Sequence, residues 1–186
     1  HRGFGADGLM LIEPTAKGAR TRLWNADGGK AEISGNGIRC AAAWIAHEQG
    51  AAPGDTLLID TEAGPRRLTL LEVDDERYTF RAEMGLPEQL REETIEIDGQ
   101  PVRGVVLRVG NPQCVVLGPA TPERLHGIAA KLSVHPFFPE GTNVELAEVE
   151  APGRVRILIW ERGVGPTEAS GTGACAAAVA AAFAGG

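Results

Sequence analysis

The sequence predicts an α+β fold of two pseudo-symmetric lobes, each a mostly antiparallel sheet wrapped around one central helix. A segment that begins at Trp24 occurs again at Trp160, a constant offset of 136 positions (24 to 160) that also aligns Ser34 with Ser170. In both copies an apolar strand leads through a glycine-rich loop into an alanine-rich segment. Short strand-like runs accompany each copy. Internal duplication therefore predicts two lobes of similar construction.

In the first lobe, one strong helix is expected among several strands. Residues 38–49 contain good helix formers with no internal glycine or proline, and Gly50 follows as a stop signal. The alanines in this helix have small side chains, which let the surrounding strands approach its axis closely. Strands are predicted from apolar or alternating runs at residues 9–12, 20–24, 56–60, 67–73 and 78–83.

The boundary between the lobes is predicted at a polar segment, residues 85–93, which gives lobes of 1–85 and 86–186. Asp98-Gly99 is a strong signal for a tight hairpin, and Pro152-Gly153 indicates another. A surface helix is expected at residues 122–132 and an alanine-rich helix at 173–184. The predicted strands are residues 94–97, 102–109, 114–117, 143–149 and 154–160.

Composition excludes several classes of function. The net charge of −7 disfavours nucleic acid and anionic membrane as partners, because phosphate binding needs clustered Lys and Arg. The apolar run at 174–184 is too short to span a bilayer. Cys40, Cys114 and Cys175 form no C-x-x-C pair, so neither a disulfide framework nor a metal site is indicated. A reducing compartment, the cytoplasm, fits this cysteine usage.

The two Ser-Gly-x-Gly turns are the candidate chemical sites. Each would begin a helix, whose free N–H groups and positive dipole end bind a carboxylate and favour developing negative charge there. Two such ends acting on one ligand could place a reactive group on each side of it. The alternative is that both turns are ordinary helix caps. Cys40 and Cys175 lie further along these helices and are expected to be core residues.

Five ordered motifs resemble diaminopimelate epimerase over nearly the whole chain. They are Asn25-Ala-Asp-Gly, Ser34-Gly-Asn-Gly-Ile-Arg-Cys, Gly110-Asn-Pro-Gln-Cys, Asn143, and Glu161-Arg-Gly-Val-Gly leading to Ser170-Gly-Thr-Gly-Ala-Cys-Ala. Members of that family invert an amino-acid α-carbon without a cofactor, using one cysteine on each face of the carbon. The resemblance places those cysteines at Ser34 and Ser170, so both thiols are replaced. Gln113 stands where the family motif often continues with His.

The resemblance also implies a substrate site and a pathway. The two serines and Glu161 take the catalytic positions, and the remaining site residues would bind the substrate: Asn25, Gly35, Asn36, Asn111, Asn143, Arg162, Gly171 and Thr172. Arg162 could pair with the distal carboxylate. The implied reaction interconverts LL- and meso-diaminopimelate in lysine and cell-wall precursor synthesis, impaired here by the two serines. The small-molecule substrate is the expected partner, and a homodimer is compatible with this interpretation.

Alternatives stay open at the level of the sequence. The serine pair is explained either by deliberate replacement of both cysteines or by natural divergence. The chain could then be an inactive amino-acid-binding homologue, or another cofactor-independent isomerase with Glu32, Glu161 or Glu168 as base. The family normally has further segments at both ends, so the chain from His1 to Gly186 is expected to be a fragment.

Overall fold

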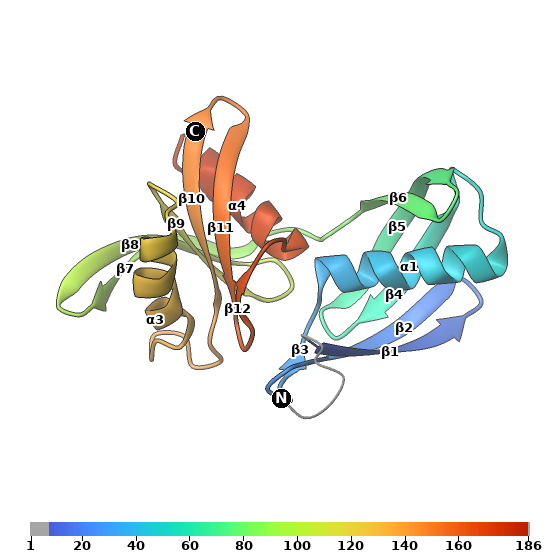
Figure 1. Ribbon diagram of the computed structural model, residues 1–186, viewed down its shortest axis with the longest axis horizontal. Helices are drawn as coiled ribbons and strands as arrows, with labels where there is room; N and C mark the ends of the chain where they lie inside the picture. The colour runs from blue at the N-terminus through green and yellow to red at the C-terminus, as the bar shows by residue number, and fades with distance from the viewer. Residues whose placement is uncertain (1–7, 186) are drawn as a thin grey trace. The chain divides into compact units, whose positions relative to one another are not determined.

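The computed structural model describes residues 8–185, which form two compact units that divide between Gly85 and Leu86. The sequence around His1 also predicts a strand-and-turn region, which lies outside the described residues. Each unit contains a six-stranded sheet and one long helix (Figure 1), so the predicted α+β class is confirmed.

The first unit is a sheet with one helix packed against one of its faces. Its elements are β1 (Gly8–Thr15), β2 (Gly18–Asn25), β3 (Lys30–Ala31), α1 (Gly35–Gln49), β4 (Thr56–Thr61), β5 (Gly64–Asp74) and β6 (Arg77–Ala82). The strand order is β1-β2-β4-β5-β6, and β3 pairs with the far end of β2. The β2–β4 pair is parallel because α1 makes the connection between them, whereas the other pairs are antiparallel.

Helix α1 buries one face against this sheet. Ile38 and Ile45 are fully buried in a cluster with Ile59, Leu68 and Leu70 of the strands. The helix ends at Gly50, whose left-handed backbone (φ 63°) is the conformation that glycine adopts without steric cost. The opposite face meets solvent. The expectation that Cys40 is a core residue is therefore wrong, because Cys40 points to the exposed side of the helix.

The second unit has a helix on each face of its sheet. Its strands are β7 (Glu88–Ile97), β8 (Gln100–Arg108), β9 (Pro112–Leu117), β10 (Asn143–Ala151), β11 (Arg154–Glu161) and β12 (Gly165–Thr167), in the order β12-β11-β10-β9-β8-β7. A continuous helical segment follows β9 and consists of α2 (Pro122–Arg124), the π-helical turn η1 (Leu125–Ala129) and α3 (Ala130–Ser133). Helix α4 (Gly171–Phe183) follows β12.

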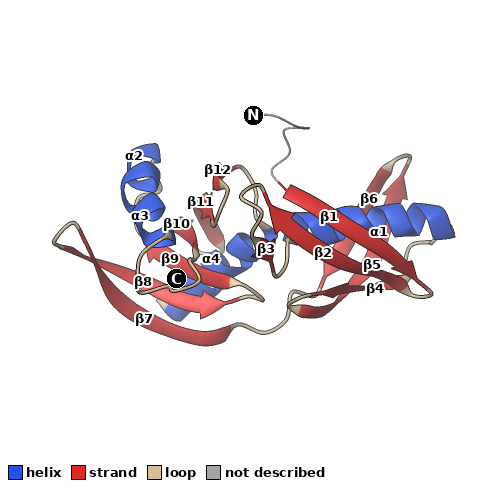
Figure 2. Ribbon diagram, turned by 90° about the horizontal axis from the view of Figure 1, so that it is seen from below, coloured by secondary structure: helices blue, strands red, loops and turns tan. Residues whose placement is uncertain are grey.

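The α2–α3 segment and α4 lie on opposite faces of this sheet (Figures 1 and 2), and strand register assigns the side chains to these faces. Cys114 pairs with Val144, and Val144 with Trp160, so this row faces the apolar cluster that the α2–α3 segment completes. One residue earlier on β9 and β10, Gln113 pairs with Asn143. Side chains alternate between the faces of a strand, so the second row faces α4.

The duplication is visible in the structure. Strand β2 and helix α1 begin at Gly18 and Gly35, and β11 and α4 begin 136 positions later at Arg154 and Gly171. The short strands β3 and β12 also match, because Trp24 of β2 pairs with Lys30 of β3 and Trp160 of β11 pairs with Pro166 of β12. Neither β3 nor β12 was predicted from sequence.

Two predicted elements need correction. The strand predicted at 94–97 begins earlier, since β7 starts at Glu88, and its position at the edge of the sheet leaves most of its side chains in water. The helix predicted at 122–132 is interrupted by a π-helical turn. The hairpin predicted at Asp98-Gly99 is confirmed, since both residues have positive φ (53° and 74°), as a type I′ turn requires.

Candidate functional site

The two Ser-Gly-x-Gly turns adopt the same capping geometry. Ser34 precedes α1 with φ −127° and ψ 120°, and its Oγ accepts a hydrogen bond from Gly37 N at 3.0 Å. Ser170 precedes α4 with φ −136° and ψ 124°, and its Oγ accepts from Gly173 N at 3.2 Å. Each serine satisfies one of the N–H groups that a helix leaves free at its start. A helix N-terminus of this kind is a site where proteins bind anions.

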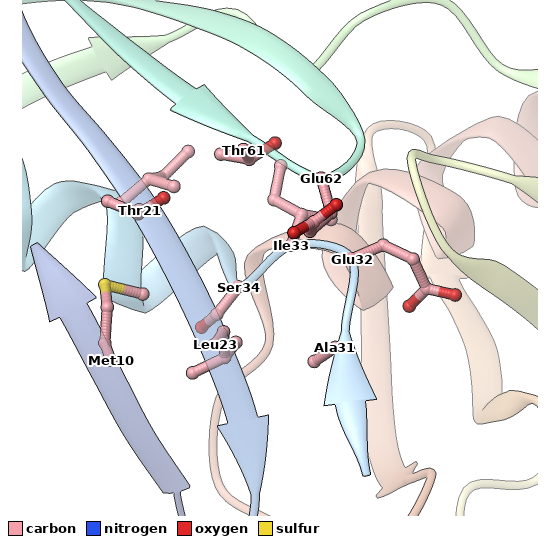
Figure 3. A pocket seen from close by; sticks show the side chains of 10 residues that line it. Met10, Thr21, Leu23, Ala31, Glu32, Ile33, Ser34, Thr61 and Glu62 are labelled. Atoms are coloured by element: carbon pink, nitrogen blue, oxygen red, sulfur yellow. The ribbon is translucent and has the colours of Figure 1, made fainter.

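The first turn lies in a small pocket of the N-terminal unit (Figure 3). Ser34 shares the lining with Met10 and Leu23 on the strand side and with Glu32 and Thr61 near the turn. Figure 3 shows the Glu32 carboxylate pointing away from Ser34. Glu32 therefore lies near the turn without aiming at the serine hydroxyl.

Asn25, Gly35 and Asn36 belong to the same unit as Ser34. Asn25 ends β2 in a tight turn, where its carbonyl accepts from Gly28 N at 2.9 Å. Gly35 is the buried first residue of α1. The Asn36 side chain accepts a hydrogen bond from the guanidinium of Arg39. Gly35 and Asn36 thus lie in the first turn of α1, and Asn25 lies at the end of β2.

The other predicted site residues belong to the second unit. Asn143 opens β10 and bridges two segments, because its Nδ2 donates to Pro112 O (3.2 Å) while its Oδ1 accepts from Arg162 N (2.9 Å). The Arg162 side chain is anchored as well, since Nη1 donates to Glu140 O at 2.9 Å. Glu161 is the last residue of β11, directly before Arg162.

A buried polar network lies on the α4 face of this sheet. Gln113 is fully buried, and its amide forms a 2.6 Å hydrogen bond with that of Asn111. In the orientation that satisfies both ends of its amide, the Gln113 nitrogen donates to Glu145 Oε1 at 2.9 Å and Oε2 at 3.2 Å. Its oxygen then accepts from Asn143 Nδ2 at 3.3 Å and from Thr172 Oγ1 at 3.2 Å.

Thr172 connects this network to the capping serine. Its Oγ1 lies 3.3 Å from Ser170 Oγ, and the residue is buried in the first turn of α4. The network therefore extends from a buried carboxyl to the serine at the start of α4. Five of the predicted residues, Asn111, Asn143, Ser170, Gly171 and Thr172, meet along it or at its end.

Burial controls the ionisation of the groups in this part of the sheet. Burial, and then the nearby carboxylate of Glu161, raise the pKa of Glu145 from 4.5 to about 8. Burial, followed by the charge of Glu145, raises the pKa of the Cys114 thiol to about 12. Burial also raises the pKa of half-buried Cys175. Cys114 and Cys175 are thus disfavoured as thiolate bases.

Sequence reasoning missed Glu145 and recognised Gln113 only as a departure from a motif. The alternating run Val144-Glu145-Leu146 is typical of a strand with one solvent-exposed face, on which the glutamate would lie. Helix α4 covers that face instead. The candidate base Glu168, by contrast, lies exposed just before the Ser170 turn.

Several further features of residues 8–185 bear on function. Residues 8–185 contain no group of three or more His, Cys, Asp or Glu residues that could hold a metal ion. No helix among them is long and apolar enough to cross a bilayer. All three cysteines are free thiols.

Comparison with protein families gives a match to the family described as diaminopimelate epimerase, over residues 1–90 and 105–186. The chain is 44% identical to a diaminopimelate epimerase of Desulforudis audaxviator, and the alignment covers 96% of this chain and 69% of the relative. It is 39% identical to the enzyme of that name from Moorella thermoacetica, with 98% and 71% covered.

Solved structures share the fold at low identity. A hydroxyproline epimerase from Agrobacterium vitis superposes with a TM-score of 0.73 at 16% identity, covering 95% of this chain and 60% of that chain. A PhzF-family phenazine biosynthesis protein of Bacillus anthracis superposes with a TM-score of 0.63 at 12% identity, with 90% and 63% covered. This chain thus spans less than two thirds of those structures. The likeness shows a common architecture.

Proposed function

This chain belongs to the diaminopimelate epimerase family, and from that premise we propose that its reaction is the cofactor-independent interconversion of LL- and meso-diaminopimelate. The observation that carries the proposal is the pair of matched turns. Ser34 and Ser170 hold equivalent capping positions, with the same backbone conformation and the same hydrogen bond to the third residue of the helix. Each unit thereby offers one helix N-terminus to an amino-acid carboxylate.

Inversion needs a base on one face of the α-carbon and an acid on the other. In the proposal, position 34 and position 170 supply these two groups. A thiol at a helix N-terminus has a pKa below its reference value of about 8.5, so it can exchange a proton near neutral pH. A serine hydroxyl ionises far less readily and needs an activating base. The epimerase activity of this chain is therefore proposed to be impaired by the serines at both positions.

Substrate contacts are proposed for the polar residues around the two turns. Backbone N–H groups at Gly35, Asn36, Gly171 and Thr172 would bind the carboxylate at the reacting centre. Asn25, Asn111, Asn143 and Arg162 would hold the distal amino-acid end, and Glu161 would contact an amino group or tune the acid–base pair. The side chains of Asn143 and Arg162 are each held by hydrogen bonds to the backbone, which supports a preorganised site.

A second function, binding of an amino acid without turnover, is supported by the serine contacts themselves. Both hydroxyl oxygens accept a backbone N–H of their own helix and so act as ordinary caps. Such turns keep their anion-binding N–H groups while lacking a usable base. Free thiols at all three cysteines support a reducing location such as the cytoplasm for either function.

Two measurements separate these functions. Calorimetric titration with meso-diaminopimelate tests binding, and absence of binding at millimolar ligand would contradict both proposals. Incorporation of deuterium from heavy water into the α-position then tests turnover. Slow incorporation supports the impaired epimerase, and binding with no incorporation supports the binding protein.

Restoring both thiols is the direct test of the two-group mechanism. Ser34→Cys combined with Ser170→Cys is expected to raise epimerisation by orders of magnitude, because each face regains a group with a usable pKa. Either single change should give little net inversion, so the effects should be strongly non-additive. Cys40 and Cys175 already place thiols later in the same helices, so the starting chain controls for thiols in the wrong place. A double variant that binds diaminopimelate and stays inert would refute the mechanism.

A further inference from the structure

We propose that Glu145 is a positioning residue of the site: its buried carboxyl fixes the amide of Gln113, which in turn orients the Thr172 hydroxyl and the Asn143 amide toward their places in the substrate site. The substrate role of Thr172 and Asn143 rests on the proposed function. The positioning itself is a property of the second unit alone and can be measured without substrate.

Glu145 has an unusual location for a glutamate. It is the third residue of β10, paired with Val115 on β9 and Ile159 on β11, both apolar and buried. Its side chain is fully buried under the first turn of α4. A Cβ built on Gly173 would lie 2.6 Å from Glu145 Oε1, so the absence of a side chain at Gly173 makes room for the carboxyl. A fully buried carboxyl is costly unless hydrogen bonds compensate it.

The compensating hydrogen bond comes from Gln113, one row away on the same face of the sheet. Both carboxyl oxygens lie within 3.2 Å of the Gln113 nitrogen in its satisfied orientation. The other end of this amide is its carbonyl oxygen, which meets the Asn143 nitrogen, the Thr172 hydroxyl and, at 2.6 Å, the Asn111 amide, whose nitrogen donates to it once that amide is turned as well. Glu145 and Asn143 together favour this orientation, because the reversed one would set the Gln113 nitrogen against the Asn143 nitrogen and the Gln113 oxygen against the unprotonated carboxyl oxygen.

The consequence reaches the catalytic turn. With the amide held, the Gln113 oxygen accepts the Thr172 proton, and the Thr172 oxygen keeps its lone pairs toward Ser170 Oγ at 3.3 Å. The Gln113 oxygen also accepts a hydrogen bond from Asn143 Nδ2. At the other end of the Asn143 amide, Oδ1 accepts the backbone N–H of Arg162. A single buried carboxyl thus orients side chains on β9, β10 and α4. Removing the acceptor leaves the buried Gln113 nitrogen unsatisfied in this orientation and favours the turned one, in which the nitrogen donates to Asn111 Oδ1.

The charged surroundings of Glu145 make this device sensitive to pH. Glu161 on β11 and the Cys114 thiol on β9 are the titratable groups that interact with it. The residues that α4 packs nearest to it, Thr172 and Gly173, carry no charge. Ionisation of Glu145 therefore places a second negative charge in a buried region beside Glu161. The Gln113 amide is the first group that senses this charge.

The test follows the side chains directly by NMR, with signals assigned for the Gln113 side-chain amide and the Thr172 methyl group. In the starting protein both signals should move with one midpoint near pH 8. Glu145→Gln keeps an acceptor oxygen of the same size, so both signals should stay near their low-pH positions and lose the titration. Glu145→Leu removes the acceptor, and both signals should be displaced at every pH.

Two controls separate positioning from general damage. Glu148→Gln makes the same substitution on the same strand, where Glu148 accepts from Ala120 N outside the network. Leu146→Ala destabilises the opposite face of β10, where Leu146 is fully buried. Both controls should leave the titration of Gln113 and Thr172 intact. The proposal is overturned if these signals ignore pH, or if Glu145→Leu displaces them no more than Leu146→Ala does.

Substrate binding gives an independent outcome. Glu145→Leu should weaken binding of meso-diaminopimelate roughly tenfold, the effect of one lost buried hydrogen bond, and Glu145→Gln should restore most of it. Coupled NMR signals with no binding in any variant would refute the proposed function and leave the positioning role standing. Binding that Glu145→Leu leaves unchanged would overturn the link from Glu145 to the substrate site.

Discussion

The stability of the second unit should fall as pH rises, and Glu145 should be the cause. Its carboxyl has a pKa of about 8 in the folded chain against 4.5 for an ordinary glutamate, because burial penalises the charged form. Between these values the folded state holds a proton that the unfolded state has released. Unfolding therefore becomes more favourable as pH increases through this window, and the stabilisation is fully present only below pH 4.5.

The size of the effect follows from the two pKa values. A rise from 4.5 to about 8 corresponds to a loss of about 5 kcal/mol in the free energy of unfolding across the window, which is the ceiling for one group. That is comparable with the whole stability of a small domain, about 5–15 kcal/mol. Glu145→Gln cannot ionise, so it should gain stability over the starting protein steadily from pH 5 to pH 8.

Urea unfolding between pH 5 and pH 9 measures this difference. Trp160 lies in the second unit beside His126, with ring centroids 5.6 Å apart, and it becomes the only tryptophan when Trp24 and Trp44 are changed to phenylalanine. Its fluorescence then follows this unit in both proteins, and the other titrating groups cancel in the comparison. A stability difference that is independent of pH across the window would refute the raised pKa and its physical cause.

Three further changes test the first unit, each by urea unfolding of that unit. Gly18→Ala should cost about 3 kcal/mol or more, because its Cβ would lie 2.0 Å from Leu58 O; a loss under about 1 kcal/mol would show that β2 and β4 are not so close. Ile38→Ala should cost about 2–5 kcal/mol, since Ile38 is fully buried, and a neutral result would contradict the packing of α1. The Cβ that Gly50→Ala adds would have no neighbour within 4 Å, so the change should lower the free energy of unfolding by only about 1 kcal/mol, because position 50 has a left-handed backbone. A neutral or stabilising effect would disprove this prediction.

Local sequence signals were sufficient for much of the fold. The helix before Gly50 and the hairpin at Asp98-Gly99 were predictable because glycine and aspartate tolerate positive φ where few other residues do. The repeat from Trp24 to Trp160 was enough to predict two lobes of like construction, and the capping serines were visible as the residue type that helix starts prefer. These features depend on residues close together in the chain.

Features that depend on distant residues were decided only by the tertiary structure. Strands β3 and β12 have two and three residues, too few to show a period, and they form because β2 and β11 offer them a partner. The alternation around Glu145 is that of a strand with one face in water. Helix α4, which begins more than twenty positions later in the chain, covers that face and buries the carboxyl. The sequence determined which side chains were available at the site. The packing of α4 on β9 and β10 decided that Gln113, Glu145 and Thr172 form one buried hydrogen-bond network. The reason is that burial depends on what packs against a strand and not on the strand's own residues.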